Sequence, residues 1–379
     1  MGYVAVKGGT AAIEESLNRL RYERIKQGQV LDIDKIACGM RSLIDQVMSE
    51  SSLYGETLAA IAIKQAEGSP EEAVFLLRAY RSTLPRKHYS RTVVSDAMRI
   101  ERRISASFKD IPGGQILGAS TDYSHRLLDF DLIGETGAEA EAWLCEFELK
   151  GETERQDRSA DDSFTGKLPK VLDYLRREGL IADCPNDDRE PDDVTRRSLT
   201  FPASRSQKLQ ILTRGQTGAV TSMAYAVIRG YGDVHPTVGE LRVGQLPICV
   251  DNPLNPSDDE DDAYYIGDIK VTEVEMLMPT MVEKEKGRKE LAFDFGYGLC
   301  YGQNETKAIA MSILDKSLER GDRSLPTQNE EFVLFHIDSV ESTGFISHLK
   351  MPHYVTFQAK LNDVRKTKRA GAAADHEVN

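Results

Sequence analysis

The sequence predicts an α+β fold, with a mostly helical N-terminal half and a C-terminal half of mixed strands and helices. Apolar residues recur at helical spacing through residues 33–84. Residues 266–278 alternate between apolar and polar side chains, and residues 291–301 are rich in Phe, Tyr and Gly, which is typical of strands. The glycines of 291–301 indicate bulges or a close approach of another backbone.

Helices are expected in the first half at residues 10–26, within 33–84 and at 94–109. The start at Ser69-Pro70 is well defined, because serine can cap a helix and proline suits its first position. Residues 3–6 are expected to form a short strand that ends in a Gly-Gly turn. The helix at 94–109 would carry Arg99, Arg102 and Arg103 on one side.

In the second half, strands are expected at residues 239–243, 266–278, 291–301 and 331–337. Helices are expected after Ser204, over 219–228, and after Asn304, where the helix would be a crossover. These elements suggest a helical-rich domain (1–150), a polar connecting region (151–200), an α+β domain (201–365) and a disordered tail (366–379).

Composition and net charge argue against several classes of protein. The net charge of −13 argues against bulk nucleic-acid binding. No apolar run approaches the roughly 18 residues of a membrane span. The five cysteines are widely spaced, which fits reduced thiols in a cytoplasmic protein and excludes an iron–sulfur site built by this chain alone.

A histidine corner lies near the C-terminus. His348 and His353 are two of only seven histidines, and Pro352 lies between them. Proline disfavours a helical conformation at Met351, so the chain is expected to bend there and bring both imidazoles together. Two imidazole nitrogens would make half of a zinc-type site. The alternative is one buried, hydrogen-bonded histidine and one exposed one.

The same region carries a resemblance to a known family. The sequence resembles the carbon–phosphorus lyase core complex subunit I, also called the α-D-ribose 1-methylphosphonate 5-triphosphate synthase subunit. The resemblance spans nearly the whole chain and is carried by residues 3–9, 75–81, 99–105, 110–115, 125–130, 229–232, 296–299, 330–334 and 344–355. It is weakest at residues 131–200, 251–290 and the tail.

The resemblance implies a ribosyl transferase acting within a complex. An alkylphosphonate oxygen would displace adenine from MgATP and give a ribose 1-phosphonate 5-triphosphate. It implies that His348 and His353 bind Zn²⁺ (or Fe²⁺) near the interface with the radical iron–sulfur subunit. The net charge of −13, the apolar Gly- and Phe-rich strand region and the incomplete metal site predict a member of an assembly, so the chain is expected to co-purify with the other core subunits as a multimer containing two copies of it. No other catalytic residue is carried over.

Candidate cations for the triphosphate are Arg102, Arg103, Lys350 and Lys7. The alternative for the two arginines is a solvated or ion-paired helix face. The Gly-rich cradle of phosphoryl transfer, with its aligned Lys, is missing from the sequence, so adenine release with all three phosphates retained on the ribose is expected.

Two other functions compete with the transferase. The chain could be a scaffold whose histidines serve a metal site completed by a partner subunit. It could also be a free-standing zinc hydrolase, but catalytic zinc usually has three protein ligands. His336 is the candidate third ligand, on the strand expected at 331–337.

Overall fold

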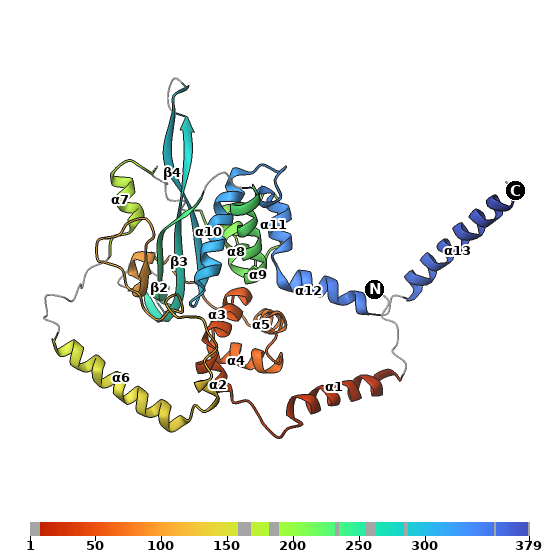
Figure 1. Ribbon diagram of the computed structural model, residues 1–379, viewed down its shortest axis with the longest axis horizontal. Coiled ribbons are helices and arrows are strands. Elements are labelled where there is room, and N and C mark those ends of the chain that lie inside the picture. The colour runs from red at the N-terminus through yellow and green to blue at the C-terminus, as the bar shows by residue number, and fades with distance from the viewer. Residues whose placement is uncertain are drawn as a thin grey trace.

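The computed structural model describes residues 8–157, 168–181, 189–231, 235–254, 262–283, 287–351 and 354–377. These residues form an α+β fold, as the sequence predicts. A four-stranded sheet lies at the centre and helices pack around it (Figure 1). The expectations for residues 3–7, Pro352 and His353 fall outside the described residues.

The sheet is antiparallel throughout, in the order β1-β2-β3-β4. Its strands are β1 (Arg99–Ile104), β2 (Thr237–Val250), β3 (Tyr264–Glu283) and β4 (Lys289–Tyr301). The register places Arg103 opposite Arg242, Glu240 opposite Glu275, and Val274 opposite Gly298. The strands expected around 239–243, 266–278 and 291–301 are therefore confirmed, each within a longer strand.

Most of the expected N-terminal helices are also confirmed. After α1 (Gly9–Ile25), a small bundle contains α2 (Ile33–Gly39), α3 (Arg41–Ser51), α4 (Glu56–Gln65) and α5 (Pro70–Thr83). Its core contains residues such as Val47, Ala60 and Val74, all fully buried. The Ser69 side chain accepts the backbone N–H of Glu72, which is the predicted cap of α5.

A second group of helices covers one face of the sheet. It contains α8 (Arg205–Arg214), α9 (Thr217–Ala226), α10 (Glu305–Arg320) and α11 (Glu330–His336). Ser204 and Gln207 form a complete capping box at the start of α8. Apolar side chains of β2 and β3, such as Val243 and Val274, share one core with α10. This face of the sheet is therefore a conventional apolar interface.

The opposite face of the sheet is charged and is covered by other segments. Helix α7 (Val171–Arg177) and the loop around Ile111 pack on it through a small apolar cluster that includes Leu277 of β3. Short turns complete the described elements: 3-10 turns at Ser95–Ala97, Asp131–Ile133, Pro326–Gln328 and His348–Lys350, and a π turn at Val227–Tyr231.

The helix expected at 94–109 is wrong, because residues 99–104 form the edge strand β1. Its charged side chains resemble the exposed face of a helix, but Arg102 and Arg103 are almost completely buried. They point to opposite faces of the strand, where each finds carboxylate partners. Long-range ion pairing thus overrides the local helical pattern.

The strand expected at 331–337 is also wrong, because residues 330–336 form α11. The Asn329 side chain caps this helix by accepting the N–H of Phe332, and two acids occupy its first turn. Val333, Leu334 and Ile337 are buried at helical spacing. The helix expected after Asn304 exists as α10, but it follows the last strand and is not a crossover.

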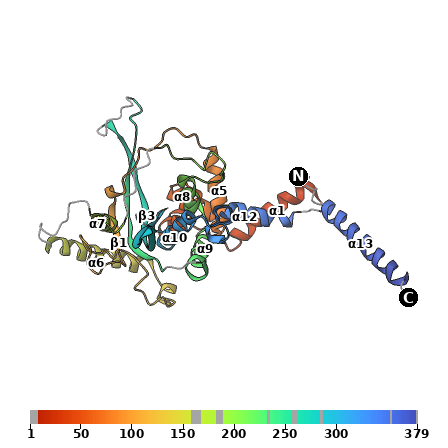
Figure 2. The same cartoon turned by 90° about the horizontal axis from the view of Figure 1, so that it is seen from above.

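Several helices extend away from this body (Figures 1 and 2). They are α1, α6 (Gly137–Asp157) and α13 (Tyr354–Glu377), and α12 (Ser339–Ser347) leads toward α13. No residue of α1 is buried. Residues 366–377, expected as a tail, lie within α13. Strand β1 joins the first 150 residues to the sheet of the second half, and the domain boundaries stay a prediction.

Within the part of the chain that the structure describes, no helix combines the length and the apolar character that crossing a membrane requires.

Two glycines of β4 allow α10 to lie directly against the strand. A Cβ atom built on Gly298 would lie 2.0 Å from the carbonyl oxygen of Ala308, and one on Gly296 would lie 1.9 Å from that of Ser312. Both oxygens belong to the backbone of α10, so neither can move alone. The expected close backbone approach at these glycines is confirmed.

We expect Gly298→Ala to lower the free energy of unfolding by about 3 kcal/mol, because the helix must separate from the strand. Urea denaturation measures the change. Gly344→Ala is the matched control, since nothing lies within 4 Å of its Cβ position and alanine favours helix α12. Equal stability of the two variants would contradict the close packing.

Candidate functional site

The histidine corner begins where α12 ends. His348 follows Ser347 in a 3-10 turn, is partly buried, and packs edge-on against Phe345 with ring centroids 5.1 Å apart. Its Nδ1 is hydrogen-bonded to the Phe345 carbonyl oxygen. Since a carbonyl can only accept, Nδ1 carries the proton and Nε2 carries the lone pair. A hydrogen bond from the non-ligating nitrogen is what orients a metal-binding imidazole.

The chain leaves this turn in an extended conformation at Met351, with ψ of 149°, as expected before a proline. Lys350 is exposed on the same turn. His353 lies outside the described residues, and so does Lys7. The structure thus places one of the two expected metal ligands and one of the two lysines.

His336 is an exposed residue of helix α11 rather than of a strand. Its Nδ1 donates to the Phe332 carbonyl oxygen at 2.7 Å, and its ring lies 4.5 Å from that of Phe332. Across the described ranges, no group of three or more His, Cys, Asp or Glu side chains is arranged to hold a metal ion. The described residues alone therefore do not fit a complete zinc site.

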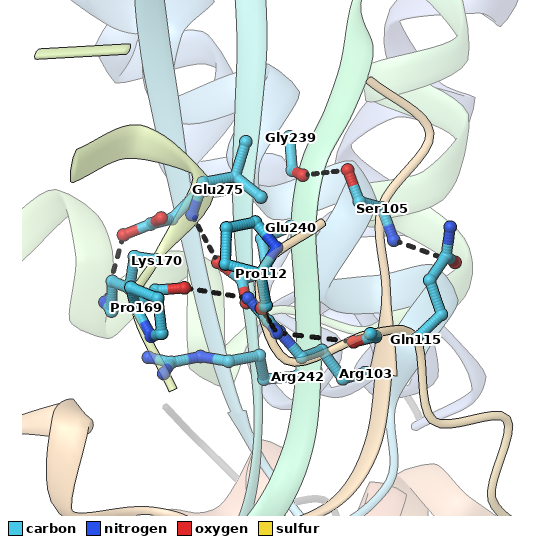
Figure 3. Close-up of polar contacts among 12 residues, drawn as sticks. Arg103, Ser105, Pro112, Gln115, Pro169, Lys170, Gly239, Glu240, Arg242 and Glu275 are labelled. Carbon is cyan, nitrogen blue, oxygen red and sulfur yellow. Dashed lines mark hydrogen bonds and ion pairs between the residues drawn. The ribbon is translucent and has the colours of Figure 1, made fainter. Parts of the chain in front are cut away.

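Arg102 and Arg103, the candidate triphosphate ligands, are held by protein groups. The Nε atom of Arg102 lies 3.0 Å from Glu305 Oε1, and its Nη atoms contact Asp122 and the Leu117 carbonyl oxygen. Arg103 is fully buried, with Nε 2.5 Å from Glu240 Oε1. Its other donors reach the carbonyl oxygens of Pro112, Gly114 and Pro169 (Figure 3).

Arg103 belongs to a buried charge network on the second face of the sheet (Figure 3). We define this network as Arg103, Lys170, Glu240, Arg242, Glu273, Glu275 and Tyr297. Three cations face three carboxylates, so the group is neutral overall. Strands β1, β2, β3 and β4 each contribute to it, and Lys170 reaches in from the start of α7.

Glu273 is the centre of this network. Its Oε2 accepts from Arg242 Nε at 3.0 Å, while its Oε1 accepts from Lys170 Nζ at 3.2 Å and from the Tyr297 hydroxyl at 2.9 Å. Lys170 also donates to Glu275 at 3.0 Å. Glu240 binds Arg103 with one oxygen and accepts the backbone N–H of Val171 at 2.9 Å with the other.

The two central glutamates differ in pKa. Burial acts to raise the pKa of Glu273, but Arg242 and Lys170 outweigh burial and lower the pKa to about 2. Burial raises the pKa of Glu275, which has Lys170 as its closest cation and Glu273 as a like-charged neighbour. Burial and the neighbouring Glu273 raise the pKa of Tyr297 well above its ordinary value. Every charged group of the network has an oppositely charged partner, although Glu275 Oε2 accepts no hydrogen bond among the described residues, and this pairing is typical of a structural element.

The sequence did not lead us to predict this buried charge network. Its signal was the alternation of charged with apolar residues at 240–243 and 272–276, which places all the charges on one face. An alternating strand is usually interpreted as half-exposed. Only the covering segment 168–177, which brings Lys170, shows that this charged face is buried.

Comparison with known proteins identifies the family. The model of the bacterial phosphonate metabolism protein (PhnI) family matches residues 2–371. The chain belongs to this family.

Three relatives match almost end to end. HtxH of Stutzerimonas stutzeri, named as a C-P lyase subunit protein, is 43% identical over an alignment of 379 residues that covers 98% of each chain. The α-D-ribose 1-methylphosphonate 5-triphosphate synthase subunit PhnI of Rhizobium meliloti (strain 1021) is 41% identical, covering 98% of this chain and 96% of the relative. The subunit of the same name from Escherichia coli (strain K12) is 39% identical, covering 97% and 98%.

We expect Glu273→Gln to destabilise the fold by about 3–5 kcal/mol, because the change leaves Arg242 and Lys170 buried with too little negative charge. The pKa of Glu273 falls from 4.5 to about 2 on folding, so its ionisation stabilises the protein above pH 4.5. That contribution is lost as the pH falls toward 2.

Denaturant unfolding between pH 6 and pH 2 checks this prediction. The wild type should lose more stability over this range than Glu273→Gln, since the variant lacks the titrating group. Glu283→Gln is the control, because Glu283 is exposed at the end of β3. Parallel pH profiles for the wild type and Glu273→Gln would contradict the assignment.

Proposed function

We propose that this chain is the nucleotide-processing subunit of a carbon–phosphorus lyase complex in phosphonate catabolism, where it transfers the ribose of ATP to an alkylphosphonate. One observation carries the proposal: two relatives named as α-D-ribose 1-methylphosphonate 5-triphosphate synthase subunits are 41% and 39% identical over nearly the full length.

In the proposed reaction, an oxygen of the phosphonate forms a bond to C1 of the ribose, and the bond from C1 to N9 of adenine breaks. Adenine leaves with the bonding electron pair and takes up one proton. The phosphonate is already anionic at neutral pH, so no general base is required. The bond breaks through an oxocarbenium-like state, as in glycoside cleavage. Mg²⁺ enters with ATP as its counter-ion.

A zinc or ferrous ion held by His348 and His353 is part of the proposal. The protonated Nδ1 of His348 leaves Nε2 as the ligating nitrogen, and this supports the assignment. The described residues supply no three-ligand group, so we propose that a partner subunit, the radical iron–sulfur subunit, completes the coordination. When bound, the ion would supply Lewis-acid chemistry at the interface.

The triphosphate assignment to Lys7, Lys350, Arg102 and Arg103 stays a prediction. Lys350 is exposed beside the histidine corner and can reach an external anion. Arg102 and Arg103 would have to exchange carboxylate and carbonyl partners before they could bind a nucleotide. Among the described candidates, Lys350 is therefore the most accessible.

A scaffold function is the second candidate, and exposed apolar helices favour it. Trp143 and Phe147 stack on each other on α6 and are largely exposed, as are Phe345 of α12 and Val355 and Phe357 of α13. Apolar residues in such number on extended helices are typical of surfaces that partner subunits cover. In this reading, the chain would position the histidines and a partner would perform the reaction.

We expect the purified complex to release adenine from MgATP when methylphosphonate is present, with all three phosphates kept on the ribose. Chromatography of the free base and phosphorus NMR of the product check this outcome together. Phosphate or ADP with adenine still attached would refute the transferase function. Release of adenine by the isolated chain would exclude the purely structural scaffold.

We expect the double variant His348→Ala/His353→Ala to lose its bound metal and to abolish growth on methylphosphonate as sole phosphorus source, while keeping a wild-type circular dichroism spectrum. The reason is that both expected ligands of this chain are removed. His88→Ala is the control, because His88 is exposed and lies far from the corner in the sequence. Normal growth or unchanged metal content in the double variant would contradict the site.

A further inference from the structure

A second set of cations, each partly buried, lies where the helical bundle meets the helices on the sheet. Arg78 of α5 is the centre of this seam. Its Nη1 contacts both carboxylate oxygens of Asp338 at 2.7 and 2.8 Å, its Nε and Nη2 donate to the Glu50 carbonyl oxygen, and Nη2 also donates to the Arg214 carbonyl oxygen. Asp338 in turn caps α12. Arg78 therefore has a complete structural role.

Two further arginines converge on one residue at this seam. Arg81 Nη1 donates to the carbonyl oxygens of Ser51 and Ser52 at 2.8 and 3.4 Å. Arg214 Nη1 lies 3.5 Å from the Ser52 hydroxyl oxygen. Ser52 has a left-handed backbone with φ of 55° and ends α3. The shared partner brings the two guanidinium groups together.

Arg214 has few partners for a guanidinium group with five N–H donors. Its bond to Ser52 is at the long limit of a hydrogen bond, and its Nε is buried without an acceptor among the described residues. Arg81 donates through Nη1 alone within the part of the chain that the structure describes. A buried donor without an acceptor is costly, so this arrangement needs an additional acceptor.

Among the described residues, no carboxylate forms an ion pair with Arg81 or Arg214. Burial, followed by the neighbouring Arg78 and Arg81, lowers the pKa of Arg214 to about 10. Burial, Arg78 and Arg86 likewise lower the pKa of Arg81. Of the acids that act on Arg214, Asp338 is paired with Arg78 and Asp193 with Arg86. Neither of these two carboxylates is left to neutralise it.

We propose that Arg81 and Arg214 bind a phosphate or phosphonate group of a ligand. Guanidinium forks match the oxygens of a tetrahedral oxyanion, and a dianion neutralises two cations. Both side chains are only partly buried, so each keeps some contact with solvent. The Ser51 and Ser52 carbonyl oxygens that would repel an anion already accept from Arg81. This site does not include the triphosphate candidates named above. The proposal that it binds an oxyanion does not depend on the proposed transferase reaction.

Binding measurements on the purified full chain test the site. Calorimetry at constant ionic strength would use methylphosphonate, inorganic phosphate and tripolyphosphate as probes, with chloride and adenosine as blanks. We expect saturable binding of at least one probe, and a Kd at least tenfold weaker in Arg214→Gln and in Arg81→Gln. The probe bound most tightly identifies the source of the oxyanion. Arg323→Gln, on an exposed loop, should bind like the wild type.

Thermal unfolding without phosphate separates a binding role from a structural one. Removing an uncompensated cation should leave the unfolding temperature of Arg214→Gln equal to that of the wild type or higher. Arg78→Gln, which breaks the Asp338 pair, should unfold at a lower temperature. Three results would overturn the proposal: no probe binds the wild type, the Kd is unchanged in Arg214→Gln, or Arg214→Gln is destabilised as much as Arg78→Gln.

Discussion

The burial of three cations and three carboxylates on one face of the sheet is the constraint on which the rest of this structure depends. Each charge needs a partner inside the protein, because moving an unpaired charge out of water costs several kcal/mol. Glu273 meets this need for two cations at once, and Glu240 links Arg103 to the backbone of α7. The edge strand, the central strands and the segment 168–177 are therefore fixed relative to one another by the same group of bonds.

This constraint also explains which elements the sequence predicts well. Helices such as α5 and α8 carry their own signals, a capping serine and an apolar stripe, and both form as expected. Strand β1 has a local sequence typical of a solvated helix, and only distant residues such as Glu240 make it a buried strand. The α11 segment has a strand-like apolar run, and the Asn329 cap determines that it is helical. Prediction therefore fails at β1 because its stabilising contacts are distant, and it fails at α11 because the apolar run was given more weight than the local cap at Asn329.

The candidate site also has features that follow from local contacts and features that depend on distant groups. Proline after Met351 predicts an extended residue beside the histidine corner, and the structure has one. The orientation of His348 depends on Phe345, three residues earlier, and so could be anticipated from helix geometry. Completing a metal site requires ligands that the described part of this chain does not bring together. Such a site, next to helices with exposed apolar residues, is the arrangement expected of a subunit whose chemistry is finished at an interface.

The two arginine clusters differ in whether buried carboxylates neutralise their cations. This difference distinguishes a structural cluster from one that can bind a ligand. Arg103 and Arg242 are each matched by a buried glutamate, which makes them part of the scaffold. At the seam, Asp338 is paired with Arg78, and the Arg214 side chain makes one long hydrogen bond, to Ser52, among the described residues. A protein gains nothing in stability from a desolvated cation without a counter-ion. Such a cation is most simply explained by a ligand that brings the missing negative charge, and this reasoning favours the seam over the sheet as a place for phosphate.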